Sequence, residues 1–149
     1  MLYPSVSAGH ELMGLVMTAV IGYLTSAETE KGCMMIDKTA LIAAGIDPDD
    51  ALKRLMNSET LYLRLIKKLL DDKTFSELKK AVEERDHELM FRASHTLKGV
   101  AGNLSLKTLY GLLISQVEFL RAGNDDEGIA MMDEVERAYN AVIEAISNI

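Results

Sequence analysis

A histidine, a lysine and a glycine at helical spacing are the residues of this chain best suited to chemistry. His95 lies in segment 88–106, ELMFRASHTLKGVAGNLSL, and is followed by Lys98 and Gly99. Residues three and four positions apart share one face of a helix. Histidine can act as a nucleophile through a ring nitrogen. The spacing therefore indicates a reactive imidazole that has a cation beside it and no large neighbour.

The helical period of this segment predicts which side faces the core. A 3.6-residue repeat counted from Leu89 separates an apolar stripe from a polar one. We expect the apolar stripe to be buried: Leu89, Ala93, Leu97, Val100, Ala101 and Leu104. We expect the other stripe to face solvent: Glu88, Arg92, His95, Lys98, Gly99 and Gly102.

The composition of the 149-residue chain favours one all-α domain. Hydrophobic residues make up 48%, Pro occurs twice and Trp is absent, and the abundant Leu, Ala, Met, Glu and Lys are strong helix formers. The formal net charge of −7 argues against binding to nucleic acid or to an anionic membrane. The single cysteine, Cys33, and the absence of zinc-ligand spacings predict no metal site and suit a reducing cytoplasm.

Residues 1–36 are predicted to form an N-terminal extension with an apolar helix at about 11–27. This stretch, ELMGLVMTAVIGYLTSA, is apolar on nearly every side, which is typical of a buried or a membrane helix. Its apolar run is shorter than the roughly 18 residues of a membrane span, and no Lys or Arg precedes it. We expect it to pack against the domain, to form a homodimer or to contact a sensor protein.

The rest of the chain, 38–149, is predicted to form a helical bundle domain. Short helices are expected at 34–44, 48–56 and 59–70, and Asp47-Pro48 is a strong start signal for the second. Four longer helices follow at about 75–84, 86–103, 105–121 and 126–147, with Asp86 as the cap of the second of these. Short connections make successive helices antiparallel. We therefore predict an up-down four-helix bundle over about 75–147, with the earlier helices covering one end or flank.

Segment 94–104, SHTLKGVAGNL, closely resembles the signature of the histidine-containing phosphotransfer (HPt) domains of bacterial multistep phosphorelays. The similarity extends over roughly residues 38–149, the size of one domain. It implies that His95 accepts a phosphoryl group from an aspartyl phosphate on a receiver domain and passes it to another receiver. It also implies a cytoplasmic phosphotransfer intermediate without a kinase site of its own.

The resemblance also implies partners and a role for Lys98. The Lys98 ammonium would offset the phosphoryl charge. Response-regulator receiver domains would be the partners, with a hybrid sensor kinase as a further candidate. The chain would need no cofactor, and Mg²⁺ would be bound by the receiver. The alternative is a helical binding module that docks receivers or other helical proteins without being phosphorylated, although such a module could lack His95 or Lys98.

The receiver is expected to dock around His95, with Phe91 as an apolar anchor. The residues expected to contact it are Glu88, Phe91, Arg92, Gly99, Gly102 and Lys107. In the HPt family a polar residue on the facing helix often hydrogen-bonds the histidine ring. The matching position here is Val117, so we expect the neighbouring Gln116 to orient the ring. Ser105 stands where the family usually has glycine, and we expect its hydroxyl to cap the next helix.

Overall fold

The computed structural model describes residues 36–149, and all regular structure within them is helical. Ile36–Ile149 forms one compact unit. The helix predicted at 11–27, and the dimer or sensor contact expected of it, fall outside the described residues. The elements are α2 (Lys38–Ala43), α3 (Pro48–Arg54), α4 (Glu59–Lys67), the short 3₁₀ helix η1 (Lys68–Asp71), α5 (Thr74–Glu84), α6 (His87–Asn103), α7 (Lys107–Arg121), α8 (Asp125–Ala130) and α9 (Met132–Ser147).

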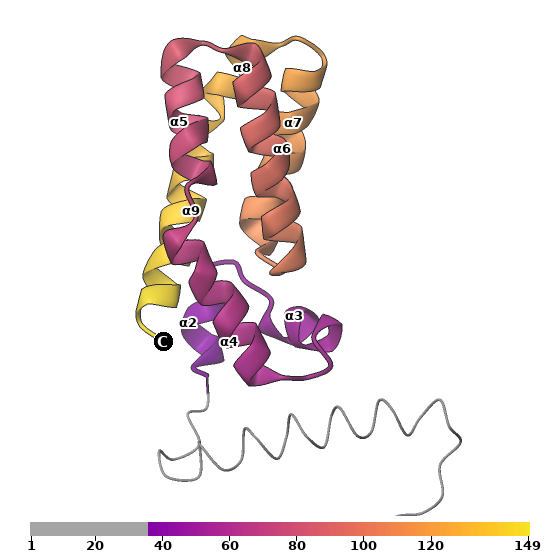
Figure 1. The fold of residues 1–149 in the computed structure, drawn as a ribbon, viewed down its shortest axis with the longest axis vertical. Helices are drawn as coiled ribbons and strands as arrows, with labels where there is room; N and C mark the ends of the chain where they lie inside the picture. Colours follow the sequence, from indigo (N-terminus) through magenta and orange to yellow (C-terminus); the bar gives the residue numbers. More distant parts are fainter. Residues whose placement is uncertain (1–35) are drawn as a thin grey trace, which may run out of the picture. The chain divides into compact units, whose positions relative to one another are not determined.

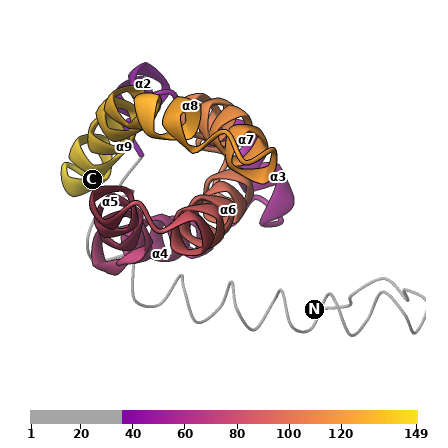
Figure 2. The ribbon, with the colours of Figure 1, turned by 90° about the horizontal axis from the view of Figure 1, so that it is seen from above.

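The longer helices form an antiparallel bundle (Figure 1). Helices α5, α6 and α7 alternate in direction, and α8 and α9 together form the fourth member. Seen from above, these elements surround a common interior (Figure 2). Helices α2, α3 and α4 lie at the lower end of the bundle in Figure 1. The predicted all-α bundle with additional helices at one end is therefore confirmed.

Side-chain caps set where three of the helices begin. Asp47, Ser58 and Asp86 each accept a hydrogen bond from the backbone N–H three residues later, at 3.0, 3.3 and 3.1 Å. Such caps satisfy N–H groups that have no partner inside the helix. Pro48 occupies the first turn of α3, as the Asp47-Pro48 pair predicts. The Asp86 cap fixes the start of α6 and therefore the face on which His95 lies.

Two of the short helices end earlier than expected. Helix α3 ends at Arg54 instead of 56, because Met56 and Asn57 have φ values of 54° and 58°, which are incompatible with a right-handed helix. Helix α4 ends at Lys67 and continues only as the 3₁₀ turn η1.

The last helix is not continuous, contrary to the prediction of one helix over 126–147. It is divided at Met131 into α8 and α9. The Gln116 side-chain amide donates a 3.0 Å hydrogen bond to the backbone carbonyl of Gly128. A side chain that bonds to a helix carbonyl is a known cause of a helix break. Gly128 also allows a close approach to α7, since a Cβ at this position would lie 2.8 Å from the Leu120 side chain.

Ser105 does not cap α7, and that prediction is wrong. Its φ is 55°, a left-handed conformation that favours glycine, which explains why glycine suits this position in the family. Residue Leu106 precedes α7 without a side-chain cap. The Ser105 hydroxyl instead donates a 2.7 Å hydrogen bond to Asp50 of α3.

Asp50 joins the lower helices to the turn between α6 and α7. Its carboxylate accepts hydrogen bonds from Ser105 at 2.7 Å and Lys107 at 2.9 Å, and it pairs with Arg54 at 3.1 Å. The Arg54 guanidinium also donates to the Gly102 carbonyl at 3.2 Å. The hydrogen bond from Ser105, followed by that from Lys107, lowers the pKa of Asp50 to about 2. The network therefore favours the ionised carboxylate and secures the C-terminal end of α6.

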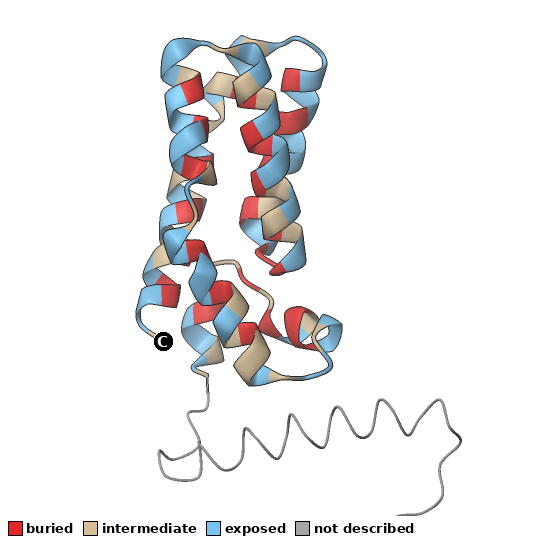
Figure 3. Cartoon of the chain, viewed as in Figure 1, coloured by how far each residue is buried: buried red, intermediate tan, exposed pale blue. Residues whose placement is uncertain are grey.

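The buried residues lie along the inner sides of the helices (Figure 3) and form a main apolar cluster and a smaller one of Ala81, Met90 and Leu120. The rings of Phe75 and Tyr139 stack across α5 and α9 with their centroids 4.0 Å apart. On α6 the expected Ala93, Leu97 and Ala101 are buried. Met90 and Ser94 are buried as well, which the sequence pattern did not predict. None of the helices within residues 36–149 has the length and apolarity needed to cross a membrane.

We expect Asp50→Asn to destabilise the protein at neutral pH and to flatten its acid dependence. A carboxylate with a depressed pKa contributes stability above the normal pKa of about 4, and this contribution is lost as the pH falls through about 2. Urea denaturation at neutral pH and at about pH 2.5 gives the free energy of unfolding at each pH. Its decrease between the two pH values should be larger in the wild type than in Asp50→Asn. The control is Glu144→Gln, which removes an exposed carboxylate. An equal decrease in the free energy of unfolding in the wild type and in Asp50→Asn would contradict the stabilising role of the Asp50 carboxylate.

Candidate functional site

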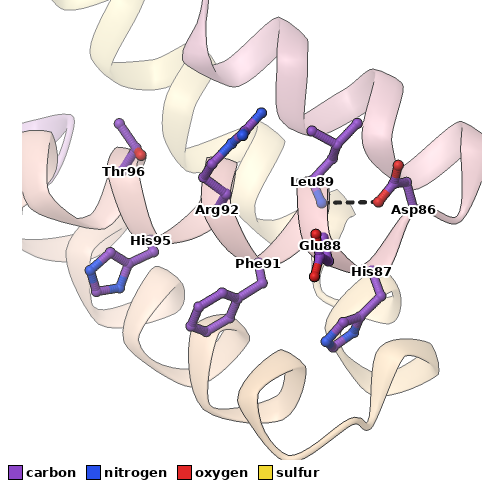
Figure 4. Close-up of a pocket in the computed structure, with 8 residues that line it drawn as sticks. All are labelled: Asp86, His87, Glu88, Leu89, Phe91, Arg92, His95 and Thr96. Carbon is purple, nitrogen blue, oxygen red and sulfur yellow. Dashed lines mark hydrogen bonds between the residues drawn. The ribbon is translucent and has the colours of Figure 1, made fainter.

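His95 lies near the middle of α6 and is exposed, as the helical period predicts. His87, Phe91 and His95 are four residues apart and point to the same side of α6 (Figure 4). Leu89, Arg92 and Thr96 point to the other side in the same view. A shallow surface depression runs along this part of the helix. It is lined by Asp86, His87, Glu88, Leu89, Phe91, Arg92, His95 and Thr96.

The His95 ring is held by one aromatic contact. It stacks on Phe91 with the ring centroids 5.9 Å apart and the planes inclined by 25°. Within residues 36–149 the imidazole makes no hydrogen bond and no ion pair. Both ring nitrogens are therefore available to an incoming group.

Lys98 and Gly99 adjoin His95 on α6, as their spacing predicts. Lys98 is half-buried, and no acidic side chain of residues 36–149 forms an ion pair with it. A Cβ placed on Gly99 would meet no atom within 4 Å. As far as residues 36–149 are concerned, the space beside Gly99 is thus open, and the Lys98 cation next to it has no acidic partner.

Gln116 does not reach the His95 ring, contrary to our expectation. Its side chain is buried, and its carbonyl oxygen accepts a 2.8 Å hydrogen bond from the Ser94 hydroxyl. Its amide nitrogen donates to the Gly128 carbonyl at 3.0 Å and to the Met132 sulfur at 3.2 Å. Val117 is fully buried and apolar. The facing helix therefore supplies the ring with no hydrogen bond from either position.

The other residues expected at the docking surface divide into two groups. Glu88, Phe91 and Arg92 line the depression together with His95. Gly102 is half-buried, and a Cβ there would lie 3.1 Å from the Tyr110 ring, so this glycine permits close packing of α6 on α7. Lys107 bonds to Asp50 beyond the end of α6. Eight residues of α6 follow His95, so at 1.5 Å per residue the end of the helix lies roughly 12 Å from His95 along the axis. Lys107 therefore lies away from the histidine.

Two residues of α7 near this surface were not predicted. The guanidinium carbon of Arg121 lies 5.9 Å from the centroid of the Phe91 ring. Ile114 is 40% exposed and lies one turn from Tyr110 and two turns from Arg121, both of which contact α6. Helical spacing places it on the same side of α7. The α7 residues expected at the site from the sequence were Lys107 and Gln116, and neither Ile114 nor Arg121 was among them, although an isoleucine exposed on a bundle helix can signal a surface role.

The upper end of α6 is joined to the first turn of α8. Arg85 pairs with Asp126 at 3.1 Å, and His87 Nδ1 hydrogen-bonds the Asp125 carboxylate at 2.7 Å. Arg85 adopts a left-handed conformation, with φ of 50°, which ends α5 and turns the chain into α6. The histidine helix is therefore anchored at its N-terminal end as well as at Asp50.

The fold and the site together define a small helical domain that presents an exposed histidine, with a neighbouring lysine and an open glycine, on the side of a bundle. The family model for the Hpt domain matches residues 65–145, more than half of the chain. The chain belongs to the Hpt domain family. No characterised protein and no solved structure matches the chain significantly.

Membership of this family gives the chain a phosphotransfer role in a phosphorelay. Hpt domains are phosphoryl carriers rather than enzymes with their own kinase site, and their partners are of the receiver type. The resemblance seen in the sequence is therefore confirmed at the level of the family.

We expect Gln116→Leu to lower the free energy of unfolding by about 1–3 kcal/mol, because it leaves the Ser94 hydroxyl and the Gly128 carbonyl buried without their partner. Ser94→Ala is the matched control. It should lower the free energy of unfolding by less than Gln116→Leu does, because it removes one hydrogen bond. Urea denaturation of the two variants and of the double variant would give the coupling between the side chains. A stable Gln116→Leu protein with altered His95 NMR signals would instead support contact with the ring.

Proposed function

We propose that His95 is the phosphoryl-accepting residue of this Hpt domain and that it carries the group from one receiver domain to another. The observation that carries the proposal is an exposed imidazole whose two nitrogens have no partner within residues 36–149. The other described histidine, His87, is engaged with Asp125.

The transfer needs few groups on this chain. A neutral imidazole nitrogen attacks phosphorus with its lone pair, and the bond between phosphorus and the aspartyl oxygen breaks, so that the carboxylate leaves with the bonding electrons. Lys98 offsets the charge of the phosphoryl group on His95 as a nearby point cation. The reverse sequence of events passes the group to the next receiver. Mg²⁺ would be bound by the receiver, which also holds the reactive aspartate.

We further propose that the receiver docks on α6 around His95 and on the adjoining side of α7. Phe91 and Ile114 supply apolar contact area, and Glu88 and Arg92 supply charged groups at its edge. Gly99 lets the partner approach the helix backbone, because no side chain occupies the space above it. Response-regulator receivers, alone or within a hybrid sensor kinase, are the partners that fit this surface.

Incubation with a phosphorylated receiver should transfer label to the wild-type chain and not to His95→Gln. The label should be labile in acid and stable in base, as expected for a phosphoramidate. His10→Gln is the matched control for removal of a histidine and should accept label normally. A wild-type chain that binds receivers but never accepts label would instead be a docking module.

We expect Gly99→Ala to separate folding from transfer. Alanine has the higher helix propensity and meets no atom here, so the free energy of unfolding should rise by about 0.5–1 kcal/mol. The methyl group should obstruct the receiver and reduce transfer by about tenfold, which corresponds to about 1.4 kcal/mol. Phosphorylation by phosphoramidate, a small donor that needs no docking, is the control and should change little. Unaltered transfer from the receiver would show that the partner does not approach Gly99.

A further inference from the structure

A row of four side chains crosses from α7 to α6 and ends at His95. The carboxylate of Glu118 pairs with the guanidinium of Arg121. The Arg121 guanidinium carbon lies 5.9 Å from the centroid of the Phe91 ring, within the range of a cation–π contact. The Phe91 ring stacks on the His95 ring at 5.9 Å. The only contact that orients the imidazole is therefore aromatic within the part of the chain that the structure describes.

We propose that Phe91 is the positioning residue for His95 and that Arg121 holds Phe91 in place. This inference rests on the proposed function, because it assigns the residue that presents the accepting ring. Side chains four apart on a helix lie one above the other, so Phe91 can support the imidazole along its face (Figure 4). An exposed imidazole without such support would divide its time among the staggered χ1 rotamers.

The neighbouring helix gives the reason for this arrangement. A hydrogen bond to one nitrogen would orient the ring and fix its tautomer at the same time. Val117 has no group to make that bond, and the Gln116 amide is engaged with Ser94 and Gly128. Stacking orients the ring through its face and leaves both nitrogens free. Phe91 thus supplies orientation without the hydrogen bond that α7 does not provide.

The positioning role can be separated from a docking role with phosphoramidate, which phosphorylates histidine without a protein partner. If Phe91 confines the ring to one of about two staggered χ1 rotamers that a helix allows, Phe91→Leu should reduce the rate with phosphoramidate by about twofold. Phe91→Tyr retains the ring and should restore the wild-type rate. Arg121→Gln should give an intermediate rate. Phe119→Leu is the matched control, because it removes an aromatic ring that is 37% exposed elsewhere on α7.

NMR of the full chain provides a readout that a loss of stability would not reproduce. The χ1 coupling constants of His95 should indicate one rotamer in the wild type and in Phe91→Tyr, and averaged rotamers in Phe91→Leu. The ring-current shift of the His95 ring protons should disappear in Phe91→Leu while the remaining spectrum is retained.

Two results would overturn the proposal. One is a wild-type rate with phosphoramidate and unchanged His95 couplings in Phe91→Leu. The other is a loss confined to transfer from the receiver, which would make Phe91 a docking residue only. If the wild-type chain accepted no label from any receiver, the proposed function would fail, but the couplings and the phosphoramidate rates would still decide whether Phe91 positions the ring.

Discussion

The buried amide of Gln116 determines how the helices around His95 are arranged. Because an unsatisfied amide in the core is costly, its oxygen and nitrogen must meet partners on both neighbouring elements. Ser94 of α6 and Gly128 of α8 provide them, at 2.8 and 3.0 Å. These bonds restrict the rotation of α6 about its axis, since Ser94 can face Gln116 in only one orientation. The next residue in the chain is His95, which is thereby directed to the surface.

The contrast between these two neighbours explains how a small bundle can present a reactive group. Ser94 is fully buried in a specific contact, whereas His95 is exposed and, among residues 36–149, has only the Phe91 ring against it. Rigidity is supplied by the core and access by the surface. Lys98 and Gly99 also serve access at the surface. Lys98 supplies a positive charge, and Gly99 has no side chain that a partner would have to displace.

Local patterns in the sequence correctly predicted the Asp47 and Asp86 caps, the all-α bundle and the exposure of His95 on α6. The Asp47 and Asp86 caps act within three residues, and the apolar repeat reports the burial of Ala93, Leu97 and Ala101. The early end of α3 has a local cause, the left-handed conformations of Met56 and Asn57, whereas the errors at Gln116 and Ser105 depend on contacts distant in sequence. Gln116 was expected to orient the His95 ring because it flanks Val117, but its partners are Ser94 and Gly128, and the break at Met131 accompanies its bond to Gly128. Ser105 was misread because its partner, Asp50, lies in another helix.

The attachment of α6 at both ends has a consequence for how the protein opens. Asp125 and Asp126 hold the upper end through His87 and Arg85, and Asp50 holds the turn at the lower end. Fraying normally starts at helix termini, where opening costs least. Here the termini are closed by contacts to other helices, so the central backbone amides of α6 can exchange with solvent deuterium only when the bundle unfolds as a whole. His95 is exposed at the surface, yet we expect the backbone segment that carries it to be among the slowest of the bundle to exchange.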